Sequence, residues 1–347
     1  MKGLILCAGK GTRLQPFSFS QPKTLLPVVN KSVLEYCLEN LIKSGIKEIG
    51  IVMHPSQEGI PELIGNGEKY GCEVEYIFQI EQKGISHAVK HAEPFIGKDP
   101  FILLLGDNLI AEDLQTLIGS YHQNHSNGSI LLSSVSNPQD FGIAEIKGND
   151  IIGLEEKPKK PKSNLAVIGA YLFDSHIFEA VKAIAPSARG EYEITDAIQW
   201  LIDRGHSISY TITKKLYSDV GTIERWLEAN QWMMKRQFED QIVIGKNTIV
   251  ENCTFHGPVV IGNHCVLRNA VIGPYVSIQD HGRIENCRIE SSILLEKTEL
   301  RDLKYPVSHS VFGRNVKLNG GMKGKENAMN FYLGDKSSLK MTWELDD

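Results

Sequence analysis

The first fourteen residues carry the clearest chemistry in the sequence. An apolar run, Leu4–Cys7, leads directly into Ala8-Gly9-Lys10-Gly11-Thr12-Arg13. Small residues let backbone N–H groups approach a phosphate closely, and an arginine adds a bidentate cation. The segment has neither the Gly-Lys-Ser/Thr of a Walker loop nor the third glycine of a dinucleotide-binding loop. We therefore predict a phosphate loop of another kind, with a tight strand-to-helix turn as the alternative.

Two aspartates are candidates for binding a metal. Asp107 directly follows the apolar run Phe101–Leu105, and Asp219 precedes a helical segment in Tyr217–Thr222. Carboxylates at such positions can hold Mg²⁺, which neutralises triphosphate charge during nucleotidyl transfer. The alternatives are a Gly-Asp-Asn turn for Asp107 and a turn or capping role for Asp219. Together the two residues form a plausible two-carboxylate magnesium site.

Two lysines lie in segments stiffened by proline. Lys23 stands between Pro22 and Pro27, close in sequence to the glycine-rich loop, and is a candidate phosphate clamp. Glu156-Lys157 precedes Pro158 at a strand end in a similar way. The alternatives are a surface lysine in the first case and a solvated ion pair in the second.

Composition and other spacings exclude several functions. The net charge of −5 without a basic block argues against nucleic-acid binding, and no apolar run approaches a membrane span. Six scattered cysteines without a Cys-x-x-Cys pair indicate reduced thiols in a cytoplasmic protein, without zinc or disulfides. The eleven histidines show no metal-binding spacing, and no Gly-x-Ser-x-Gly elbow of a serine hydrolase is present.

Alternating strands and helices must position these residues. Apolar strands at 49–53, 72–79 and 101–105 alternate with helices at 32–42, 58–70 and 86–95, which predicts a mostly parallel sheet covered on both faces. Ligands of such sheets bind beyond the carboxyl ends of the strands, where the glycine-rich loop and Asp107 are expected. Strand-like segments between 129 and 173 predict an antiparallel or mixed extension over the site. Helices are expected at 177–184, 194–203 and 223–235.

After about residue 240 the apolar spacing changes to six. The series is Val243, Ile249, Phe255, Ile261 and Leu267, and after a step of five it continues through Ile272, Ile278, Ile284 and Ile289. A period of six is typical of a parallel β-helix in which each of these residues faces a narrow core. We expect about four coils up to about residue 318, followed by a polar tail. The exposed coil ends suggest a homo-oligomer.

Six segments in this order resemble those of the sugar-1-phosphate nucleotidylyltransferases, and most closely the long glucose-1-phosphate thymidylyltransferases. They are residues 6–14, 22–28, 104–108, 141–145, 155–158 and 193–198. The resemblance covers essentially the whole chain, including Tyr332–Ser337. It implies an α/β fold: a Rossmann-like, mixed, mostly parallel sheet in a nucleotidyltransferase domain (1–238), then a left-handed parallel β-helix (239–325) and a tail (326–347).

The resemblance also implies a reaction and a set of site residues. A sugar 1-phosphate attacks the α-phosphorus of a nucleoside triphosphate and releases pyrophosphate, with Mg²⁺ as cofactor. The leading expectation is dTTP with glucose 1-phosphate. The implied roles are triphosphate binding by Ala8, Gly9, Gly11 and Thr12; catalysis by Arg13, Lys23 and Asp107; metal binding by Asp107 and Asp219; base recognition by Gln79 and Gly84; and sugar-phosphate binding by Gly142, Glu156, Lys157, Val167 and Tyr171.

Two segments depart from the family pattern. Gly84-Ile85-Ser86 replaces the common Gly-Leu-Ala, and Tyr217–Gly221 replaces Trp-x-Asp-Thr-Gly while retaining Asp219. Neither change removes a charged group that the proposed catalysis uses. The first touches the base pocket, and the second affects sugar packing and support of the metal.

Other functions stay open at this point. UTP is the nearest rival to dTTP, because one methyl group distinguishes the two bases; GTP with mannose 1-phosphate fits Gln79 less well. An acyltransferase site on the β-helix could use His256, His264 or His281 as its base. A catalytically inactive sugar-nucleotide sensor is disfavoured by Asp107, Asp219, Arg13 and Lys23.

Overall fold

The computed structural model describes residues 1–320, 331–335 and 337–341. The chain divides into two compact units. The first comprises residues 1–10 and 33–218, and the second comprises residues 11–32 and 219–347. These units differ from the expected domains, since the segment 11–32, which holds Arg13 and Lys23, groups with the β-helix rather than with the large sheet.

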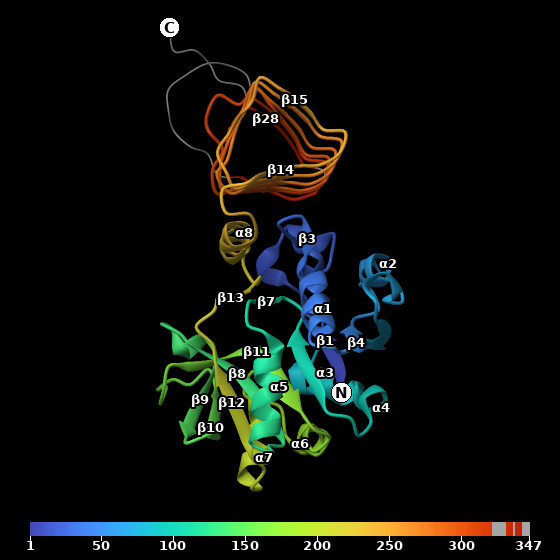
Figure 1. Ribbon diagram of the computed structural model, residues 1–347, viewed down its shortest axis with the longest axis vertical. Coiled ribbons are helices and arrows are strands. Elements are labelled where there is room, and N and C mark those ends of the chain that lie inside the picture. Colours follow the sequence, from blue (N-terminus) through green and yellow to red (C-terminus); the bar gives the residue numbers. More distant parts are fainter. Residues whose placement is uncertain (321–330, 336, 342–347) are drawn as a thin grey trace. The chain divides into compact units, whose positions relative to one another are not determined.

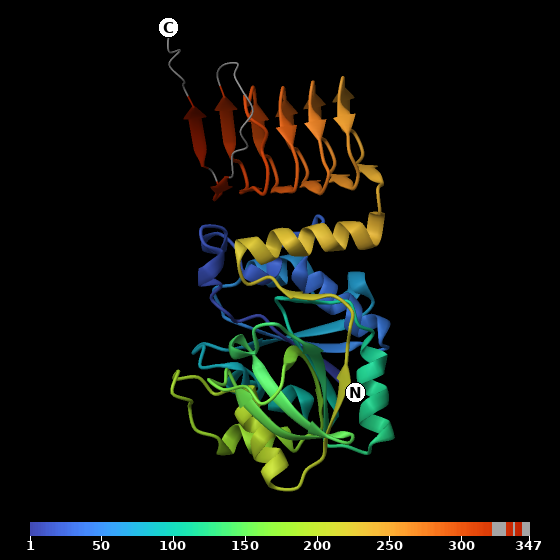
Figure 2. The ribbon, with the colours of Figure 1, turned by 90° about the vertical axis from the view of Figure 1, so that its left-hand side faces the viewer.

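The first unit is built on a nine-stranded mixed sheet, shown in Figures 1 and 2. The strand order is β5-β4-β1-β6-β11-β8-β12-β10-β9. The bounds are β1 Lys2–Leu6, β4 Glu48–Met53, β5 Glu73–Phe78, β6 Phe101–Leu105, β8 Gly128–Ser134, β9 Gly142–Lys147, β10 Asp150–Glu156, β11 Leu165–Phe173 and β12 Ile208–Ile212. A separate pair joins β7 (Asn108–Ile110) to β13 (Tyr217–Asp219), and the division between the units falls after Ser218.

Seven helices of the described residues belong to this unit. They are α1 Val33–Lys43, α2 Gly59–Ile64, α3 Ile85–His91, α4 Glu93–Ile96, α5 Leu114–Gln123, α6 Ile177–Ala183 and α7 Ile194–Asp203. The expected helices at 32–42, 177–184 and 194–203 are confirmed within a residue. The one expected at 58–70 ends at Gly65, whose φ of 65° breaks the helix, and a 3-10 turn follows at Glu68–Tyr70.

Both faces of the sheet are covered, as predicted from its apolar strands. One core cluster joins alternate strand residues such as Leu103 and Ile130 to α3, α6 and α7. The residues between them, such as Leu131, point the other way, and α5 packs against β8, β11 and β12. Because β6 lies inside the sheet and is buried on both sides, its sequence is a continuous apolar run, whereas the edge strand β5 is partly exposed and carries Glu73 and Glu75.

The strands of residues 129–173 join this sheet instead of forming an extension over the site. β11 lies in the middle of the sheet, antiparallel to both β6 and β8, and β8 runs parallel to β12. The mixed character was therefore predicted, while the placement was not. The short strand β12 and helix α5 were also not predicted.

The second unit contains α8 (Ile223–Phe238) and three parallel sheets consistent with a left-handed β-helix, as predicted. The first sheet contains β14 Ile242–Ile244, β17 Val259–Ile261, β20 Val276–Ile278, β23 Ser292–Leu294, β25 Val311–Phe312 and β27 Tyr332–Leu333. The second contains β15 Ile249–Glu251, β18 Val266–Arg268, β21 Arg283–Glu285, β24 Glu299–Arg301, β26 Lys317–Gly320 and β28 Ser338–Met341. The third contains β16 Thr254–Phe255, β19 Val271–Ile272 and β22 Arg288–Ile289.

The six-residue series is wrong at its start. In the first coils, corresponding residues of neighbouring coils lie 17 apart, so one side of such a coil is shorter than six residues. Ile249 pairs with Val266 on the outer face and is 46% exposed, whereas Val250 pairs with the buried Leu267. Val243 likewise pairs with Val260, which is not part of the β-helix core, whereas Ile244 pairs with the core residue Ile261. A shift of one residue in a strand moves a side chain to the opposite face, which is why counting back by six from Phe255 fails.

The β-helix also continues further than expected. The first and second sheets extend into β27 and β28, which lie in the stretch predicted to be a polar tail. There are six strands in each of these sheets rather than the four coils expected. Residues 321–325 of the predicted β-helix, and residues 326–330, 336 and 342–347 of the predicted tail, lie outside the described residues.

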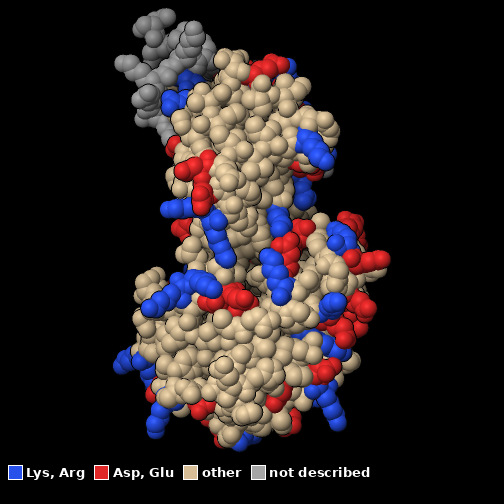
Figure 3. All heavy atoms as spheres, in the orientation of Figure 1, with Lys and Arg blue, Asp and Glu red and all other residues tan. Residues whose placement is uncertain are grey.

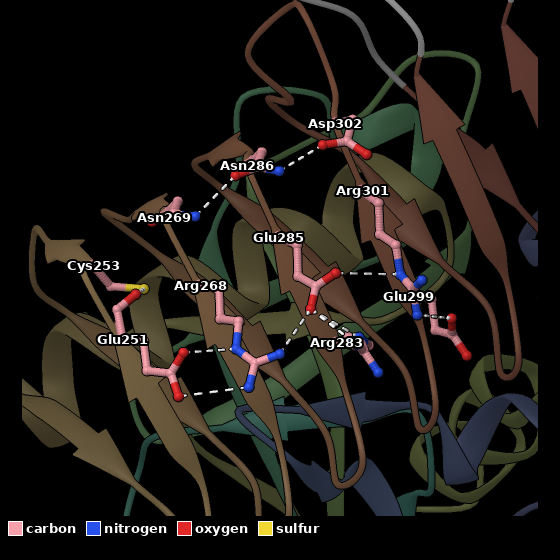
Figure 4. A network of polar contacts seen from close by, with 10 residues as sticks. All are labelled: Glu251, Cys253, Arg268, Asn269, Arg283, Glu285, Asn286, Glu299, Arg301 and Asp302. Carbon is pink, nitrogen blue, oxygen red and sulfur yellow. Dashed lines mark hydrogen bonds and ion pairs between the residues drawn. The ribbon is translucent and has the colours of Figure 1, made fainter.

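Two side-chain ladders run along the coils on one side of the β-helix (Figure 4). At one corner Asn252, Asn269 and Asn286 have φ near 50°, a conformation that asparagine tolerates, and their amides bond to one another from coil to coil. Beside them the charges alternate: Arg268 bonds to Glu251 at 2.8 Å, and Glu285 lies 3.5 Å from Arg268 and 3.6 Å from Arg301. The ladders fix the stacking of successive coils.

A buried amide helps to fasten a hairpin to this β-helix. β2 (Pro27–Val28) and β3 (Lys31–Ser32) are joined by Val29 and Asn30, both with positive φ, a strained conformation for the β-branched Val29. The Val29 N–H donates to Asn230 Oδ1 of α8 at 2.8 Å, and the Ser277 hydroxyl donates to the same oxygen at 3.2 Å. Asn230 thus joins the hairpin, α8 and β20.

Charges of both signs are interspersed over the surface of each unit on the face shown in Figure 3. Across the described part of the chain, none of the helices has the length and apolar character needed to cross a membrane.

Replacing Asn230 with alanine should destabilise the protein by about 2–4 kcal/mol, because the Val29 N–H and the Ser277 hydroxyl would be left buried without this acceptor. Urea denaturation measures the change. Asn40→Ala is the matched control: Asn40 is also a helical asparagine, but it is half-buried and donates a single bond, to the Ile110 carbonyl at 3.2 Å. Equal losses in the two variants would contradict the role given to Asn230.

Candidate active site

The first unit gathers polar residues at the carboxyl ends of its parallel strands. β1 pairs with β4 on one side and with β6 on the other, so these strands end together. Just after the ends of these strands, the side-chain amide of Gln57 donates to the Cys7 carbonyl at 2.9 Å, and the backbone N–H of Gln79 donates to the Met53 carbonyl at 2.9 Å. Cys7, Ala8, Gln79 and Asp107 therefore lie at one edge, as the sequence predicted.

Asp107 lies in a turn that its neighbours hold tightly. A side chain at Gly106 would come within 2.7 Å of the Cys7 sulfur, so only glycine fits there. On the other side, the buried Asn108 amide donates to the Ile168 carbonyl at 2.9 Å. Asp107 itself is half-buried. The turn anticipated as an alternative exists, and it fixes the carboxylate at the strand end rather than excluding a role in binding.

The second unit holds the rest of the glycine-rich segment. Gly11 has a φ of 65°, and a side chain on it would meet Lys23 Cβ at 3.0 Å. Both its conformation and this close approach therefore require glycine. Gly11 precedes a 3-10 turn at Thr12–Leu14, and Lys23 begins another, at Lys23–Leu25. The structure thus brings Lys23 next to Gly11, as expected for residues acting on one phosphate chain.

Arg13 and Asp219 both lie beside Gly221 within this unit. Asp219 Oδ1 and Oδ2 accept hydrogen bonds from Arg225 Nη1 at 2.5 and 2.6 Å. A side chain at Gly221 would lie 3.2 Å from Arg13 Nη2 and 3.0 Å from Asp219 Oδ2. Arg225 was not predicted; it lies in the first turn of α8, three residues after Thr222, whose hydroxyl caps the helix. Val220, which stands where the family has threonine, is fully buried.

The base-reading candidates form a compact segment. Gln79 is 3% exposed, and its amide nitrogen lies 3.4 Å from the Gly84 carbonyl and 3.0 Å from His87 Nδ1. Gly84 has a φ of 105°, and a side chain there would collide with the backbone of Tyr192 at 2.7 Å. The departure at Ser86 has a structural reason, because its buried hydroxyl donates to the Glu193 carbonyl at 2.8 Å.

Three of the five sugar-phosphate candidates, Gly142, Val167 and Tyr171, lie near the fourth, Glu156. A side chain at Gly142 would come within 2.6 Å of Thr195 Cγ2, 3.1 Å of Glu156 Oε2 and 3.9 Å of Val167 Cγ2. Tyr171 is buried, and burial together with the nearby Glu156 raises the pKa of its hydroxyl. Glycine at 142 therefore leaves room for Thr195 and the Glu156 carboxylate to lie directly against the backbone of β9.

The fifth candidate, Lys157, adjoins this group in a strained conformation. Its φ is 44°, unusual for a lysine and especially before proline. Its N–H donates to the Phe141 carbonyl at 3.0 Å, and its side chain is exposed. Strain of this kind concentrates at binding sites, where it places a side chain that a relaxed strand would direct elsewhere.

Glu156 belongs to a small network of charges. Burial, and then the carboxylate of Glu193, raise the pKa of Glu156. Lys157, a hydrogen bond from Thr195 Oγ1 at 3.2 Å and Arg189 oppose that rise. Arg189 Nη1 lies 3.4 Å from both Glu156 Oε1 and Glu193 Oε1, so one guanidinium balances two carboxylates.

Several of these residues were missed in the sequence. They are Arg189, Tyr192, Glu193, Thr195, His87 and Arg225. The segment 193–198 was noticed as a family pattern without a role for its side chains. An arginine in the loop Pro186–Gly190, just before that segment, was the signal that could have pointed to Arg189.

The predicted site residues are thus divided between the units. Ala8, Gly9, Gln79, Gly84, Asp107 and the sugar-phosphate group belong to the first unit, and Gly11, Thr12, Arg13, Lys23 and Asp219 belong to the second. Their functional roles stay predictions.

The three histidines considered for an acyltransferase site, His256, His264 and His281, lie in the β-helix. The rings of His264 and His281 stack at 5.2 Å.

Comparison with known proteins identifies relatives and solved structures that this chain resembles. A glucose-1-phosphate thymidylyltransferase from Streptomyces antibioticus is 36% identical over 357 residues, which covers 98% of this chain and 99% of the relative. A crystal structure assigned as a glucose-1-phosphate thymidylyltransferase from Bacillus anthracis is 36% identical, covers 66% of this chain and 94% of its own, and has a TM-score of 0.62. A structure of UDP-glucose pyrophosphorylase with UDP-glucose is 28% identical and has a TM-score of 0.62. The match covers 68% of this chain and 99% of the pyrophosphorylase chain.

The family model described as nucleotidyl transferase matches residues 2–236. That range includes every site residue predicted from the sequence. The chain therefore belongs to the nucleotidyl transferase family and is a nucleotidyltransferase similar to the glucose-1-phosphate thymidylyltransferases.

Proposed function

We propose that this enzyme transfers a nucleotidyl group from dTTP to α-D-glucose 1-phosphate, giving dTDP-glucose and pyrophosphate. The observation that carries the proposal is the 36% identity to a glucose-1-phosphate thymidylyltransferase over 98% of the chain, β-helix included. An oxygen of the sugar phosphate attacks the α-phosphorus in line, and pyrophosphate leaves. Catalysis then consists of positioning and charge stabilisation, without a covalent intermediate.

In this proposal Ala8, Gly9, Gly11 and Thr12 bind the triphosphate through their backbone. Arg13 and Lys23 stabilise the charge on the transferring and leaving phosphates. The proximity of Lys23 to Gly11 and of Arg13 to Gly221 supports these roles. Gln79 and Gly84 bind the base. Gly142, Glu156, Lys157, Val167 and Tyr171 bind the sugar and its phosphate.

Asp107 and Asp219 would hold Mg²⁺. Within the described residues no cluster of three or more metal-ligating side chains is present, which fits an ion held by one or two carboxylates and completed by phosphate oxygens and water. When bound, the ion would supply positive charge to the phosphates. Asp219 is already paired with Arg225, so Mg²⁺ must compete with or share that pair. The two hydrogen bonds from Arg225 orient the carboxylate.

UTP is the second candidate substrate. The likeness to the UDP-glucose pyrophosphorylase structure favours it, and uracil differs from thymine by one methyl group. A methyl group discriminates by about 1–3 kcal/mol, so the two activities can coexist in one enzyme with different efficiencies.

Pyrophosphate release with glucose 1-phosphate and each triphosphate tests the proposal directly. With Mg²⁺ present, dTTP should give the highest kcat/KM and UTP the next, with CTP and GTP far below, and a chelator should abolish the release. Turnover with neither dTTP nor UTP would refute the proposed reaction.

Asp107→Asn should lower kcat by about 100-fold or more without loss of stability, because it removes a metal-binding charge from an intact turn. Asp99→Asn is the matched control, since Asp99 precedes the same strand, β6, at its opposite end. Steady-state kinetics and thermal unfolding measure the two effects. Equal turnover by both variants would remove Asp107 from the metal site.

Arg189→Ala should shift the acid limb of activity to higher pH. Arg189 lowers the pKa of Glu156, so its removal lets burial and Glu193 raise that pKa further. Binding of the sugar hydroxyls is proposed to need the ionised carboxylate, which is then lost sooner as the pH falls. The KM for glucose 1-phosphate should also rise by about tenfold. Arg189→Lys, which keeps the charge, should leave the acid limb of the pH–activity profile near its original position. An acid limb that shifts in neither variant would contradict the effect of Arg189 on the pKa of Glu156.

A further inference from the structure

His87 lies against the side chain that is proposed to read the base, and the proposed reaction gives it no task. It is in the first turns of α3, which begins at Ile85. Its Nδ1 lies 3.0 Å from Gln79 Nε2, and the Gly84 carbonyl lies 3.4 Å from the same nitrogen. Gln79 is nearly fully buried, so these two neighbours control the orientation of its amide.

The pattern of donors and acceptors assigns the amide orientation and the proton on His87. A carbonyl oxygen only accepts hydrogen bonds, so the atom of Gln79 that faces Gly84 is the amide NH₂. One N–H is directed to the Gly84 carbonyl and the other to His87 Nδ1. His87 Nδ1 must then be unprotonated, and a neutral ring carries its proton on Nε2. The Gln79 oxygen, Oε1, is left as an acceptor for a ligand.

His87 is itself held in place. Its ring stacks on Tyr192 at 6.2 Å and contacts the edge of His91 at 4.7 Å. The Tyr192 backbone bonds to both sides of Gly84: the Tyr192 N–H donates to the Lys83 carbonyl at 2.8 Å, and the Ser86 N–H donates to the Tyr192 carbonyl at 3.0 Å. The acceptor nitrogen therefore has a fixed position relative to Gln79.

We propose that His87 is a positioning residue for base selection, which fixes the Gln79 amide with its oxygen toward the base. This rests on the proposed function, which assigns Gln79 to the base. An oxygen in that position selects a base edge that offers a donor at the pyrimidine N3. Thymine and uracil carry N3–H, whereas N3 of cytosine is an acceptor and would face the oxygen unfavourably.

Protonation of His87 should weaken this selection. Nδ1 would become a donor facing the Gln79 NH₂, so His87 would no longer hold the amide, and only the longer bond to the Gly84 carbonyl would keep the oxygen toward the base. Burial and the neighbouring His91, Lys83 and Lys90 lower the pKa of His87, and Glu81 partly opposes them. A lowered pKa keeps the ring neutral at neutral pH, so the change occurs only as the pH falls below the ordinary histidine range.

Nucleotide binding tests the proposal without requiring turnover. Affinities for dTDP, UDP and CDP are measured by calorimetry at about pH 7.5 and about pH 5.5. The wild type should prefer dTDP and UDP to CDP at the higher pH and lose most of this preference at the lower pH. His87→Phe, which keeps an aromatic ring and removes the acceptor, should reduce the preference by about tenfold at pH 7.5.

His87→Asn supplies a side-chain oxygen near the position of Nδ1, so it should retain the preference and lose the pH dependence. His91→Phe is the control, because it alters the neighbouring ring without touching Gln79, and it should behave like the wild type at pH 7.5. A preference unchanged in His87→Phe, or lost equally in His87→Phe and His87→Asn, would overturn the role of His87. So would a wild type that binds none of the three diphosphates.

Pyrophosphate release is scored separately. A wild type that shows the expected binding preferences but no turnover with dTTP or UTP would refute the proposed reaction while supporting the role of His87. Normal turnover with a base preference that does not depend on His87 would support the proposed reaction and refute the role of His87.

Discussion

A single buried amide fixes the part of the second unit that carries the proposed phosphate-binding cations. Asn230 lies in the middle of α8 and accepts from Val29 of the hairpin and from Ser277 of the β-helix. One turn earlier on α8, the Trp226 indole donates to the Pro27 carbonyl at 2.7 Å, and its ring meets Phe17 edge to face at 5.3 Å. Because Arg13 and Lys23 lie in the segment held by these contacts, their placement depends on α8 and the β-helix.

This dependence gives the β-helix a structural role within the second unit. The Asn30 amide donates to the Ile278 carbonyl of β20 at 2.8 Å, and the guanidinium of Arg314 donates to Gln21. Both bonds join the β-helix to the segment that contains Lys23. A coil whose stacking is fixed by the asparagine and charge ladders is a rigid support for such a loop. We therefore interpret the β-helix as a scaffold for the cationic segment, whether or not it also joins subunits.

The sequence predicted best what depends on local pattern. Continuous apolar runs identified β4 and β6, and β5 was predicted from the segment 72–79 although it contains Glu73 and Glu75. Chain order alone placed Asp107 and Gln79 at the carboxyl ends of β6 and β5. It predicted less well what depends on pairing. Nothing local in Leu165–Phe173 indicates that β11 lies between β6 and β8, and a single five-residue side was enough to move Val243 and Ile249 to the wrong face. Arg189, Arg225 and His87 were missed because their partners are brought to them by the fold, and an isolated arginine or histidine in a sequence usually lies on the surface.

The departures from the family pattern illustrate the same point. Ser86 looked like a change in the base pocket, but its hydroxyl is buried and bonds to the Glu193 carbonyl. Glu193 shares Arg189 with Glu156, so one chain of contacts runs from the segment beside Gln79 to the carboxylate proposed to bind the sugar. Tyr192 strengthens it by bonding to the backbone on both sides of Gly84. The residues proposed to bind the base and those proposed to bind the sugar therefore belong to one connected structure in the first unit. A substitution at residues 84–86 should accordingly alter the affinity for both substrates. An effect confined to the affinity for the nucleotide would contradict the coupling that these bonds predict.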